Sequence, residues 1–214
     1  MRLVLPRLYV ILDAALITSS EIDCALSLAE AGVRLLQYRN KSAPARQYLE
    51  SSRKLAEVLL PQGVSFFVND RPDVAFLAGA SGVHVGQDDL DVEQARQIVG
   101  RDNLVGVSTH NLQQFERAAG SSADYIALGP IFSTSSKANP DPVVGLDLLR
   151  KARALTDKPV VAIGGISLER AAAVIEAGAD SVAVISGILG APDPAQRARQ
   201  YIDTLASAKH AAAV

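Results

Sequence analysis

Charged and amide side chains stand at the ends of several short apolar runs. Gln37 and Arg39 alternate with Tyr38 along one run, so their side chains point to the same side, and Lys41 follows on the next turn. An arginine directed into an apolar interior needs a partner, which favours an anion-binding site over a solvated basic turn. Lys137, in a later segment rich in Ser and Thr, supplies a further cation. These residues are suited to binding a polyanion.

Two carboxylates fall at the same predicted rim. Asp70 ends one apolar run, directly after Asn69, and Asp89 lies just past the next run. Each aspartate taken alone is more simply a helix cap: Asp70 for the helix after it, and Asp88, Asp89 or Asp91 for the following one. Cations and carboxylates on one rim instead favour a pyrophosphate bridged to the carboxylates by Mg²⁺, because bare carboxylates would repel it.

Glycines at two later run ends indicate a second anion site. Gly164 and Gly165 follow one apolar run, and Ile185, Ser186 and Gly187 close the last. A glycine pair by itself indicates only a tight turn. In many barrels, however, the loops after the seventh and eighth strands, with a short extra helix, bind a phosphate group. The residues therefore predict sites for one pyrophosphate and one phosphomonoester.

The histidines and the single cysteine show no metal-binding spacing. His84 lies inside an apolar run and is equally well interpreted as a hydrogen-bonded core residue or as a ligand contact, and His110 falls at a helix start. Cys24 sits in an apolar helical stretch, which predicts a buried structural thiol, and it has no second cysteine for an internal disulfide. No nucleophile elbow is present, which disfavours covalent catalysis.

The elements that must position these residues repeat along the chain. Each unit has a helical stretch with an Ala/Gly stop, a short β-branched run and a polar or glycine-rich turn. The runs end near Asp13, Arg39, Asp70, Gly86, Ser108, Pro130, Gly164 and Ser186. The expected helices cover 21–31, 44–60, 71–78, 91–99, 112–119, 146–155, 168–177 and 194–208. Strands that alternate with helices indicate right-handed crossovers and a parallel sheet.

Eight units in 214 residues predict an α/β fold, a single-domain (β/α)₈ TIM barrel. We expect one domain over 1–214, with a core of about 7–206 and a frayed tail at 209–214. A doubly wound open sheet is the alternative. It is disfavoured because the first run lacks a G-x-G-x-x-G turn and because an eighth unit has no place in that fold. In a TIM barrel the polar run ends would form the active site.

The composition and net charge limit the classes of molecule that the chain is expected to bind. The chain is 49% hydrophobic and 21% charged, which is a globular profile, and its formal charge of −2 leaves no basic surface for nucleic acid or anionic membranes. Pro6, Arg7 and Asp13 interrupt the apolar N-terminal run, so it predicts neither a membrane span nor a cleaved signal. We expect a cytoplasmic protein that acts on small molecules. The sequence leaves its oligomeric state open, including a homo-oligomer.

From Leu8 to about Ile202, the motifs resemble those of the thiamine phosphate synthase family. The matching pieces are Q-x-R-x-K at Gln37, V-N-D at Asn69 and Asp70, G-V-H-V-G-Q-x-D at 82–89, G-V-S-x-H at Ser108, L-G-P-I-F with a Thr/Ser/Lys loop at 128–137, and I-G-G-I at Gly164. Two positions depart from the family pattern. Ser136 keeps the hydroxyl of a usual threonine, and Ser81 replaces a usual aspartate, a change that we interpret as confined to a turn.

The resemblance implies a Mg²⁺-assisted transferase. That family joins 4-amino-5-hydroxymethyl-2-methylpyrimidine pyrophosphate to 4-methyl-5-(2-hydroxyethyl)thiazole phosphate and releases pyrophosphate. By resemblance, the residues expected to hold the leaving pyrophosphate are Arg39, Lys41, Asn69 and Lys137, with Mg²⁺ on Asp70 and Asp89. Those expected to meet the pyrimidine are Gln37, the catalytic Ser108 and, nearby, His84. Those expected to bind the thiazole phosphate are Gly165, Ile185 and Ser186, with Thr134 and Ser136 at its ring end.

Two other functions fit the same fold. A thiazole tautomerase-like isomerase would share the thiazole phosphate site but lack most of the pyrophosphate residues, which this chain keeps. A non-catalytic regulator that binds thiazole phosphate would not need both carboxylates.

Overall fold

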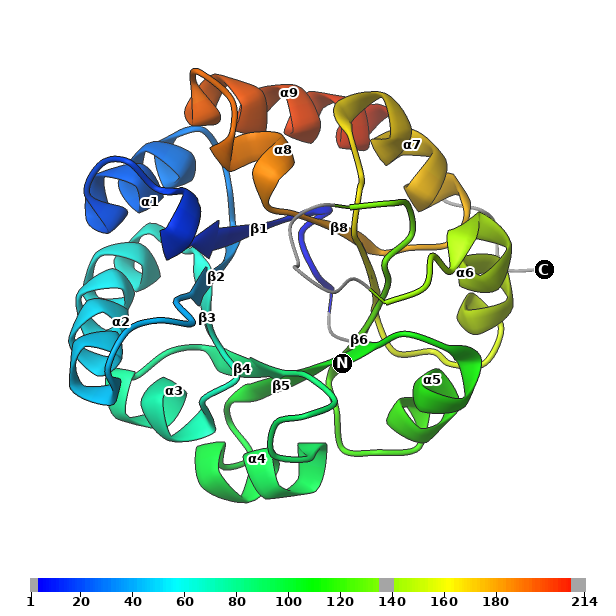
Figure 1. Ribbon diagram of the computed structural model, residues 1–214, viewed down its shortest axis with the longest axis horizontal. Helices are drawn as coiled ribbons and strands as arrows, with labels where there is room; N and C mark the ends of the chain where they lie inside the picture. The colour runs from blue at the N-terminus through cyan, green and yellow to red at the C-terminus, as the bar shows by residue number, and fades with distance from the viewer. Residues whose placement is uncertain (1–3, 135–140, 209–214) are drawn as a thin grey trace.

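The computed structural model describes residues 4–134 and 141–208, and their strands form one closed parallel barrel in chain order (Figure 1). The strands are β1 (Leu8–Asp13), β2 (Leu35–Arg39), β3 (Ser65–Asn69), β4 (Gly82–Val85), β5 (Leu104–Thr109), β6 (Tyr125–Leu128), β7 (Val160–Ile163) and β8 (Ser181–Val184). Pairing of β1 with β8 closes the ring. The predicted TIM barrel is confirmed.

Helices form the outer ring of Figure 1. They are α1 (Glu21–Glu30), α2 (Ala45–Leu59), α3 (Pro72–Ala78), α4 (Val92–Val99), α5 (Leu112–Ala119), α6 (Gly145–Arg153), α7 (Leu168–Glu176), α8 (Ser186–Leu189) and α9 (Pro194–Ser207), with the short 3₁₀ helices η1 (Ala14–Leu16) and η2 (Leu60–Gln62). No helix in the described ranges has the length and apolar character needed to cross a membrane. The expected tail at 209–214 lies outside the described residues.

Local signals place the helix starts close to the predicted positions. Ser20 Oγ accepts a hydrogen bond of 3.4 Å from Asp23 N at the start of α1. Of the three aspartates that could cap α4, Asp91 does so, in a capping box with Gln94. Capping therefore uses neither Asp70 nor Asp89, because the residue before α3 is Arg71.

The core has two parts, as in other TIM barrels. Alternate strand residues, with Leu5 from the segment before β1, fill the barrel interior; the strand residues of this cluster are Tyr9, Ile11, Leu35, Phe67, Tyr125, Ala127, Val161 and Ala183. A larger, mostly aliphatic cluster fills the space between strands and helices. Both faces of each strand are thus covered, which explains the nearly continuous apolar runs in the sequence. Cys24 packs against the larger cluster and is half-buried rather than fully buried.

A recurring polar contact joins strand pairs at the N-terminal end of the barrel. The residue just before β6, Asp124, accepts at Oδ2 from Val105 N of β5 (2.7 Å). Asp180, before β8, accepts from Val160 N of β7 (2.8 Å). At the equivalent place before β4, Ser81 Oγ accepts from Phe66 N (3.0 Å). The serine that departs from the family pattern therefore supplies the same acceptor.

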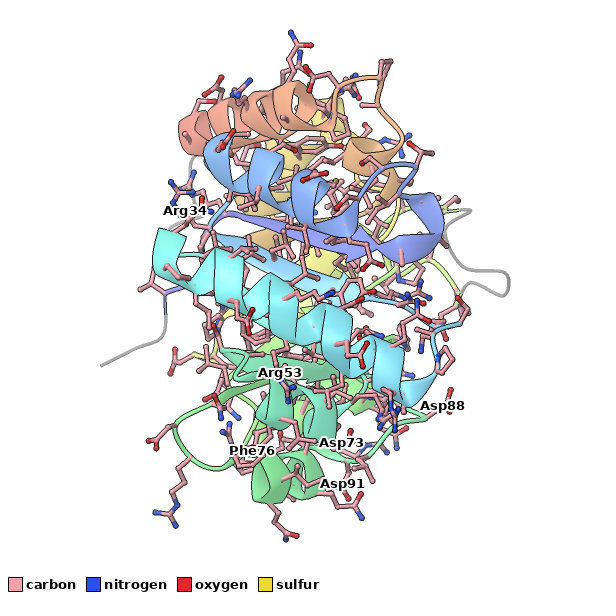
Figure 2. All side chains as sticks on the ribbon, turned by 90° about the vertical axis from the view of Figure 1, so that its left-hand side faces the viewer. Arg34, Arg53, Asp73, Phe76, Asp88 and Asp91 are labelled. Atoms are coloured by element: carbon pink, nitrogen blue, oxygen red, sulfur yellow. The ribbon has the colours of Figure 1, made fainter. Side chains whose placement is uncertain are left out.

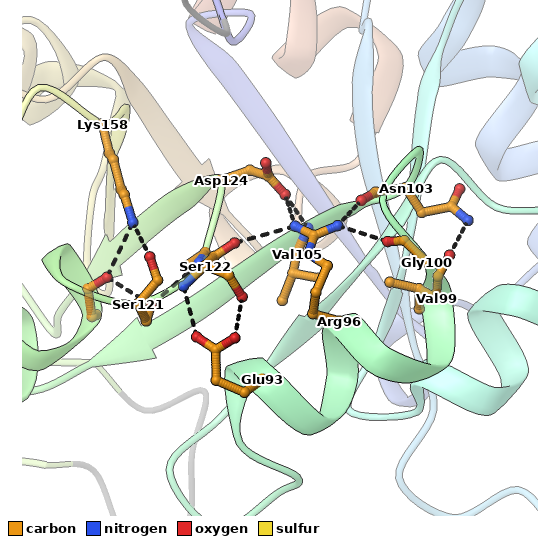
Figure 3. A network of polar contacts seen from close by, with 12 residues as sticks. Glu93, Arg96, Val99, Gly100, Asn103, Val105, Ser121, Ser122, Asp124 and Lys158 are labelled. Carbon is orange, nitrogen blue, oxygen red and sulfur yellow. Dashed lines mark hydrogen bonds and ion pairs between the residues drawn. The ribbon is translucent and has the colours of Figure 1, made fainter.

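Arginines complete two of these three contacts. Arg96 of α4 forms an ion pair with Asp124, and Arg153 of α6 forms one with Asp180. Figure 3 shows that Arg96 also donates to three backbone carbonyls, while Glu93 accepts from Ser122 alongside. These contacts tie the loops before β5 and β6 together. Figure 2 places Arg34, before β2, and Asp88, after β4, at opposite ends of the barrel.

Candidate active site

A cavity of about 910 Å³ opens at the C-terminal ends of the strands. Its lining includes all of the predicted site residues that lie in the described ranges. Those residues are Gln37, Arg39, Lys41, Asn69, Asp70, His84, Asp89, Ser108, Thr134, Gly165, Ile185 and Ser186. They come from every strand end except that of β1. The closed barrel therefore brings the polar run ends to one place, as the strand-end interpretation predicted.

Arg39 is held in place by a residue that the sequence interpretation passed over. Its guanidinium forms an ion pair with Asp13, the last residue of β1, whose carboxylate is almost buried. Asp13 also accepts at Oδ1 from Ala15 N (3.1 Å), which fixes the carboxylate against the start of η1. The inward arginine was expected to need a partner, and Asp13 meets that need inside the protein. Arg39 can still reach an anion through its other N–H donors.

The two predicted metal-binding carboxylates lie next to each other. Asp70 forms an ion pair with Lys41, and its carboxyl group is within hydrogen-bonding contact of Asp89. Asp89 Oδ2 also accepts from Gly86 N (2.7 Å). Burial and, next, the adjacent Asp70 raise the pKa of Asp89 above its usual range. Two carboxylates in contact require a proton or a cation to offset their repulsion.

The donor set fits Mg²⁺, which binds oxygen ligands and commonly uses one or two protein carboxylates together with phosphate oxygens and water. In the described part of the chain, no cluster of three or more His, Cys, Asp or Glu side chains is arranged around a common metal position. A metal ion on Asp70 and Asp89 would therefore take its remaining ligands from substrate and water.

The backbone at Asp70 is unusual. Its φ of 64° lies in the left-handed region, which is uncommon for a residue with a side chain. Tyr48 of α2 supports the segment from below: its hydroxyl oxygen lies 3.0 Å from the carbonyl oxygens of both Tyr38 and Asn69, which share its single proton. Asp70 N donates to His84 O (2.8 Å). The ends of β2, β3 and β4 are thus joined beneath the carboxylates. Strained backbone of this kind is common at functional sites.

The floor of the cavity carries amide, imidazole and hydroxyl groups. Gln37 is buried and donates from Nε2 to Tyr9 Oη (2.8 Å). His84 lies between Tyr125 Oη, 2.9 Å from Nδ1, and Ser108 Oγ, 2.8 Å from Nε2. The sequence left His84 open between a core residue and a ligand contact. The structure gives it both attributes, because it is buried, hydrogen-bonded and part of the cavity wall.

The glycine turn after β7 has a shape that requires glycine. Gly165 has φ 63°, and a Cβ added there would lie 2.3 Å from Ser133 O. The loop after β6 is therefore packed directly on this turn, with Phe132 N donating to Gly164 O (3.0 Å). At the end of the neighbouring strand β8, Ile185 and Ser186 begin the short helix α8 next to this turn. The predicted extra helix after the eighth strand is thus present.

The long loop after β6 is described in part. Thr134 lines the cavity, whereas Ser136 and Lys137 lie outside the described residues. The end of the loop is anchored by Asp141, whose Oδ2 lies 3.5 Å from His110 Nδ1. The same nitrogen lies 2.6 Å from Gly129 O. His110 therefore joins both ends of the loop, a role that a helix-start residue was not expected to have.

Taken together, the fold and cavity define a TIM barrel of the α/β class, with cations, paired carboxylates and a glycine turn around one opening. The model of the family described as thiamine monophosphate synthase matches residues 8–188. The chain belongs to that family.

Individual relatives agree with this assignment. The chain is 52% identical to a thiamine-phosphate synthase of Koribacter versatilis over 210 residues, covering 95% of this chain and 97% of that protein. It is 44% identical to the thiamine-phosphate synthase of Chloroflexus aurantiacus, covering 91% and 90%. A solved thiamine phosphate pyrophosphorylase from Pyrococcus furiosus has 32% identity and a TM-score of 0.86, covering 95% and 96%. The family assignment makes the chain an enzyme of the transferase class.

Proposed function

We propose that this chain is a thiamine-phosphate synthase. It would condense 4-amino-5-hydroxymethyl-2-methylpyrimidine pyrophosphate with 4-methyl-5-(2-hydroxyethyl)thiazole phosphate, releasing pyrophosphate and forming thiamine phosphate. One observation carries the proposal: a single cavity has paired carboxylates with cations on one side and a glycine turn facing a short helix on the other. Two differently phosphorylated molecules can thus meet in it. A cytoplasmic location is part of the proposal.

The leaving pyrophosphate would bind at the side of the cavity that carries the cations and the paired carboxylates. Lys41, Arg39 and Asn69 would donate to the phosphate oxygens, joined by Lys137 from the loop. Asp70 and Asp89 would hold Mg²⁺, which when bound neutralises negative charge on the leaving pyrophosphate. Lys41 now pairs with Asp70, so it would have to exchange that carboxylate for phosphate oxygens. Preorganised charge of this kind lowers the barrier most where negative charge develops.

The reaction would be a dissociative substitution. The bond between the pyrimidine methylene carbon and the pyrophosphate oxygen breaks first, and the electron pair leaves with the pyrophosphate. The aminopyrimidine ring stabilises the resulting cation, and the thiazole nitrogen then donates its electron pair to form the new C–N bond. Gln37 and Ser108 would orient the pyrimidine, with His84 behind them. Neither step needs an enzymic nucleophile, so the protein's task is charge stabilisation and alignment.

The thiazole phosphate would bind at the side of the cavity formed by the glycine turn and the short helix. Gly165, Ile185 and Ser186 would bind its phosphate, and Thr134 and Ser136 would contact the ring end. Backbone N–H groups at a turn and at the start of a helix bind anions well. The absence of a Cβ at Gly165 keeps that backbone accessible and the loop after β6 close. This arrangement would bring the thiazole nitrogen toward the centre of the cavity.

The direct test mixes the purified chain with both substrates and Mg²⁺, and assays thiamine phosphate after oxidation to its fluorescent thiochrome derivative. A parallel reaction contains EDTA. We expect product only in the reaction with metal. Product in both reactions would retain the coupling function but contradict the metal site on Asp70 and Asp89. No product from folded protein in either reaction would contradict the proposed function and favour an isomerase or a binding protein.

A further inference from the structure

Five polar side chains from five strands form one continuous chain across the barrel floor. Gln37 Nε2 lies 2.8 Å from Tyr9 Oη, which lies 3.0 Å from Tyr125 Oη. Tyr125 Oη lies 2.9 Å from His84 Nδ1, and His84 Nε2 lies 2.8 Å from Ser108 Oγ. The two ends of the chain, Gln37 and Ser108, line the cavity, and the two tyrosines lie beneath it.

The tyrosines cannot shift easily. Both are almost completely buried, and the Tyr125 ring stacks on His84 with centroids 5.5 Å apart. Phe67 meets the same ring edge-on, 5.6 Å away. A Cβ at Gly106 would lie 2.0 Å from the Tyr125 ring, so the ring occupies space that only glycine leaves open. Burial raises the pKa of Tyr9 and of Tyr125 well above the usual value, so both hydroxyls keep their protons.

Each hydroxyl in the chain has one proton, and therefore the whole chain has one of two donor directions. Gln37 donates to Tyr9. Among the described residues, Tyr9 Oη has no hydrogen-bond partner besides Gln37 and Tyr125, so its buried proton has an acceptor only if Tyr9 donates to Tyr125. Tyr125 then donates to His84 Nδ1. A neutral His84 accordingly carries its proton on Nε2 and donates to Ser108 Oγ. Ser108 is left with its own proton for a ligand in the cavity.

The same direction determines what Gln37 offers a ligand. A primary amide has two N–H donors and one carbonyl acceptor. With one N–H used by Tyr9, the other N–H and Oε1 remain as an adjacent donor and acceptor. They match the edge of an aminopyrimidine, where a ring nitrogen accepts and the neighbouring amino group donates. In the 4-oxo analogue the ring nitrogen carries a proton and donates, while the neighbouring carbonyl oxygen accepts. This reversed pair can bond to Gln37 only if the amide rotates by 180°, so that its N–H and Oε1 exchange places.

We propose that Tyr9 and Tyr125 are positioning residues that fix the donor direction of Gln37 and Ser108, and so select an aminopyrimidine over its oxo counterpart. A turned Gln37 would present Oε1 to Tyr9, and every hydrogen bond to Ser108 would have to reverse. The selectivity rests on the proposed function, because it assumes that the pyrimidine binds at this cavity floor. The donor direction itself does not depend on any substrate.

The donor direction is measured on the ligand-free protein. Long-range ¹⁵N–¹H NMR of the full chain labelled at histidine nitrogens distinguishes the two neutral tautomers, and a His84→Gln variant identifies the His84 signals. We expect the His84 proton on Nε2. A proton on Nδ1 would show the opposite direction and overturn the proposal.

The selectivity is measured as the ratio of kcat/KM for the aminopyrimidine pyrophosphate and for its 4-oxo analogue, with thiazole phosphate as co-substrate. We expect Tyr125→Phe and Tyr9→Phe each to lower this ratio at least about tenfold, because Gln37 can then turn, while KM for thiazole phosphate stays unchanged. Tyr38→Phe is the matched control. It removes another largely buried tyrosine hydroxyl, one that bonds Glu21 and Asn40 outside the barrel, and it should keep the ratio.

An unchanged ratio in the folded tyrosine variants contradicts the proposal. If Tyr125→Phe does not fold, Tyr9→Phe, which leaves the Tyr125–His84 bond intact, gives the test. If the wild type forms no product from the aminopyrimidine, the proposed function is wrong, and the His84 spectrum still decides the donor direction.

Discussion

Asp13 at the end of β1 and Arg39 at the end of β2 form an ion pair at the edge of the cavity, and the Asp13 carboxylate also accepts from the backbone of η1. The arginine proposed to hold pyrophosphate is therefore oriented before substrate arrives. Its charge is partly offset by Asp13, which under the proposed function would limit how tightly pyrophosphate binds after the reaction. Orientation without excess affinity suits a group that must release product.

This pair gives the first prediction. We expect Asp13→Ala to lower kcat/KM for the pyrimidine pyrophosphate roughly tenfold to a hundredfold, because Arg39 loses its fixed position and its counter-charge. Steady-state kinetics with saturating thiazole phosphate measure the effect. The control is Asp73→Ala, which breaks a more exposed arginine pair with Arg71 at the start of α3 and should leave kcat/KM unchanged. Equal effects of the two variants would rule out a specific role for Asp13.

The adjacent carboxylates of Asp70 and Asp89 lead to the second prediction. We expect Asp89→Asn to lower kcat by roughly a hundredfold or more, because one charged oxygen ligand for Mg²⁺ is lost. The Mg²⁺ concentration needed for half-maximal rate should rise at the same time. Asp102→Asn, at an exposed residue before β5 that does not line the cavity, should change neither quantity. Turnover of Asp89→Asn near the wild-type rate would remove Asp89 from the metal site.

The glycine turn gives the third. In Gly165→Ala the new methyl group meets Ser133 O in a left-handed backbone, so the loop after β6 must move. We expect KM for thiazole phosphate to rise at least about tenfold, with a smaller change for the pyrimidine pyrophosphate. Gly63→Ala isolates the backbone effect, because Gly63 has φ 72° but no atom within 4 Å of an added Cβ. If both variants behave alike, close packing at Gly165 has no part in binding.

The polar contacts at the N-terminal end of the barrel lead to the fourth prediction. Asp124→Ala leaves Val105 N and Arg96 without their shared acceptor, and we expect the free energy of unfolding to fall by about 2 kcal/mol. Urea unfolding measures this, and kcat should stay unchanged because the contact is at the far end of the barrel. Asp147→Ala removes an exposed pair with Arg150 and should cost less than about 0.5 kcal/mol. A large loss of kcat in folded Asp124→Ala protein would contradict the separation of the two ends.

The tyrosines give the fifth, a pH dependence. Burial is the first cause that raises the pKa of each of the five tyrosines, to about 12 for Tyr38 and Tyr201 and higher for the others. The folded chain then binds more protons than the unfolded chain above pH of about 10, so its stability falls as pH rises through that range. We expect the tyrosinate absorbance band to be weak in native protein at pH of about 11 and strong in urea at the same pH. Equal native and denatured titration curves would contradict this.

Much of the fold and of the cavity lining could be predicted from sequence because both follow from one-dimensional patterns. The eight β-branched runs and their Ala/Gly stops predict the strands, and parallel strands bring their ends together. Asp70 and Asp89 could be placed on one rim for that reason. Their direct contact could not be predicted, since it depends on loop conformation, including the left-handed φ of Asp70.

Contacts across the barrel were missed for a different physical reason. Tyr9 and Tyr125 look like ordinary core residues in the sequence, since each sits within an apolar run. The contact of Tyr125 with His84, through which Tyr9 is also linked to it, depends on strand register, which pairs Asn69 with His84 and Gly106 with Tyr125. The one available signal was Gly106, a residue without a side chain inside a strand, which often marks a close approach by another group. Asp13 gave less warning, because a single aspartate at a strand end also suits a turn.

The repeated acceptors before β4, β6 and β8 have a practical consequence for redesign. Ser81, Asp124 and Asp180 tie neighbouring strands at one end, while the residues that line the cavity follow the strands at the other. A substitution library confined to the loops after the strands would thus vary substrate specificity while the contacts at the N-terminal end of the barrel stay unchanged. Held fixed, the three acceptors would let new substrates be sought without a stability screen at every round.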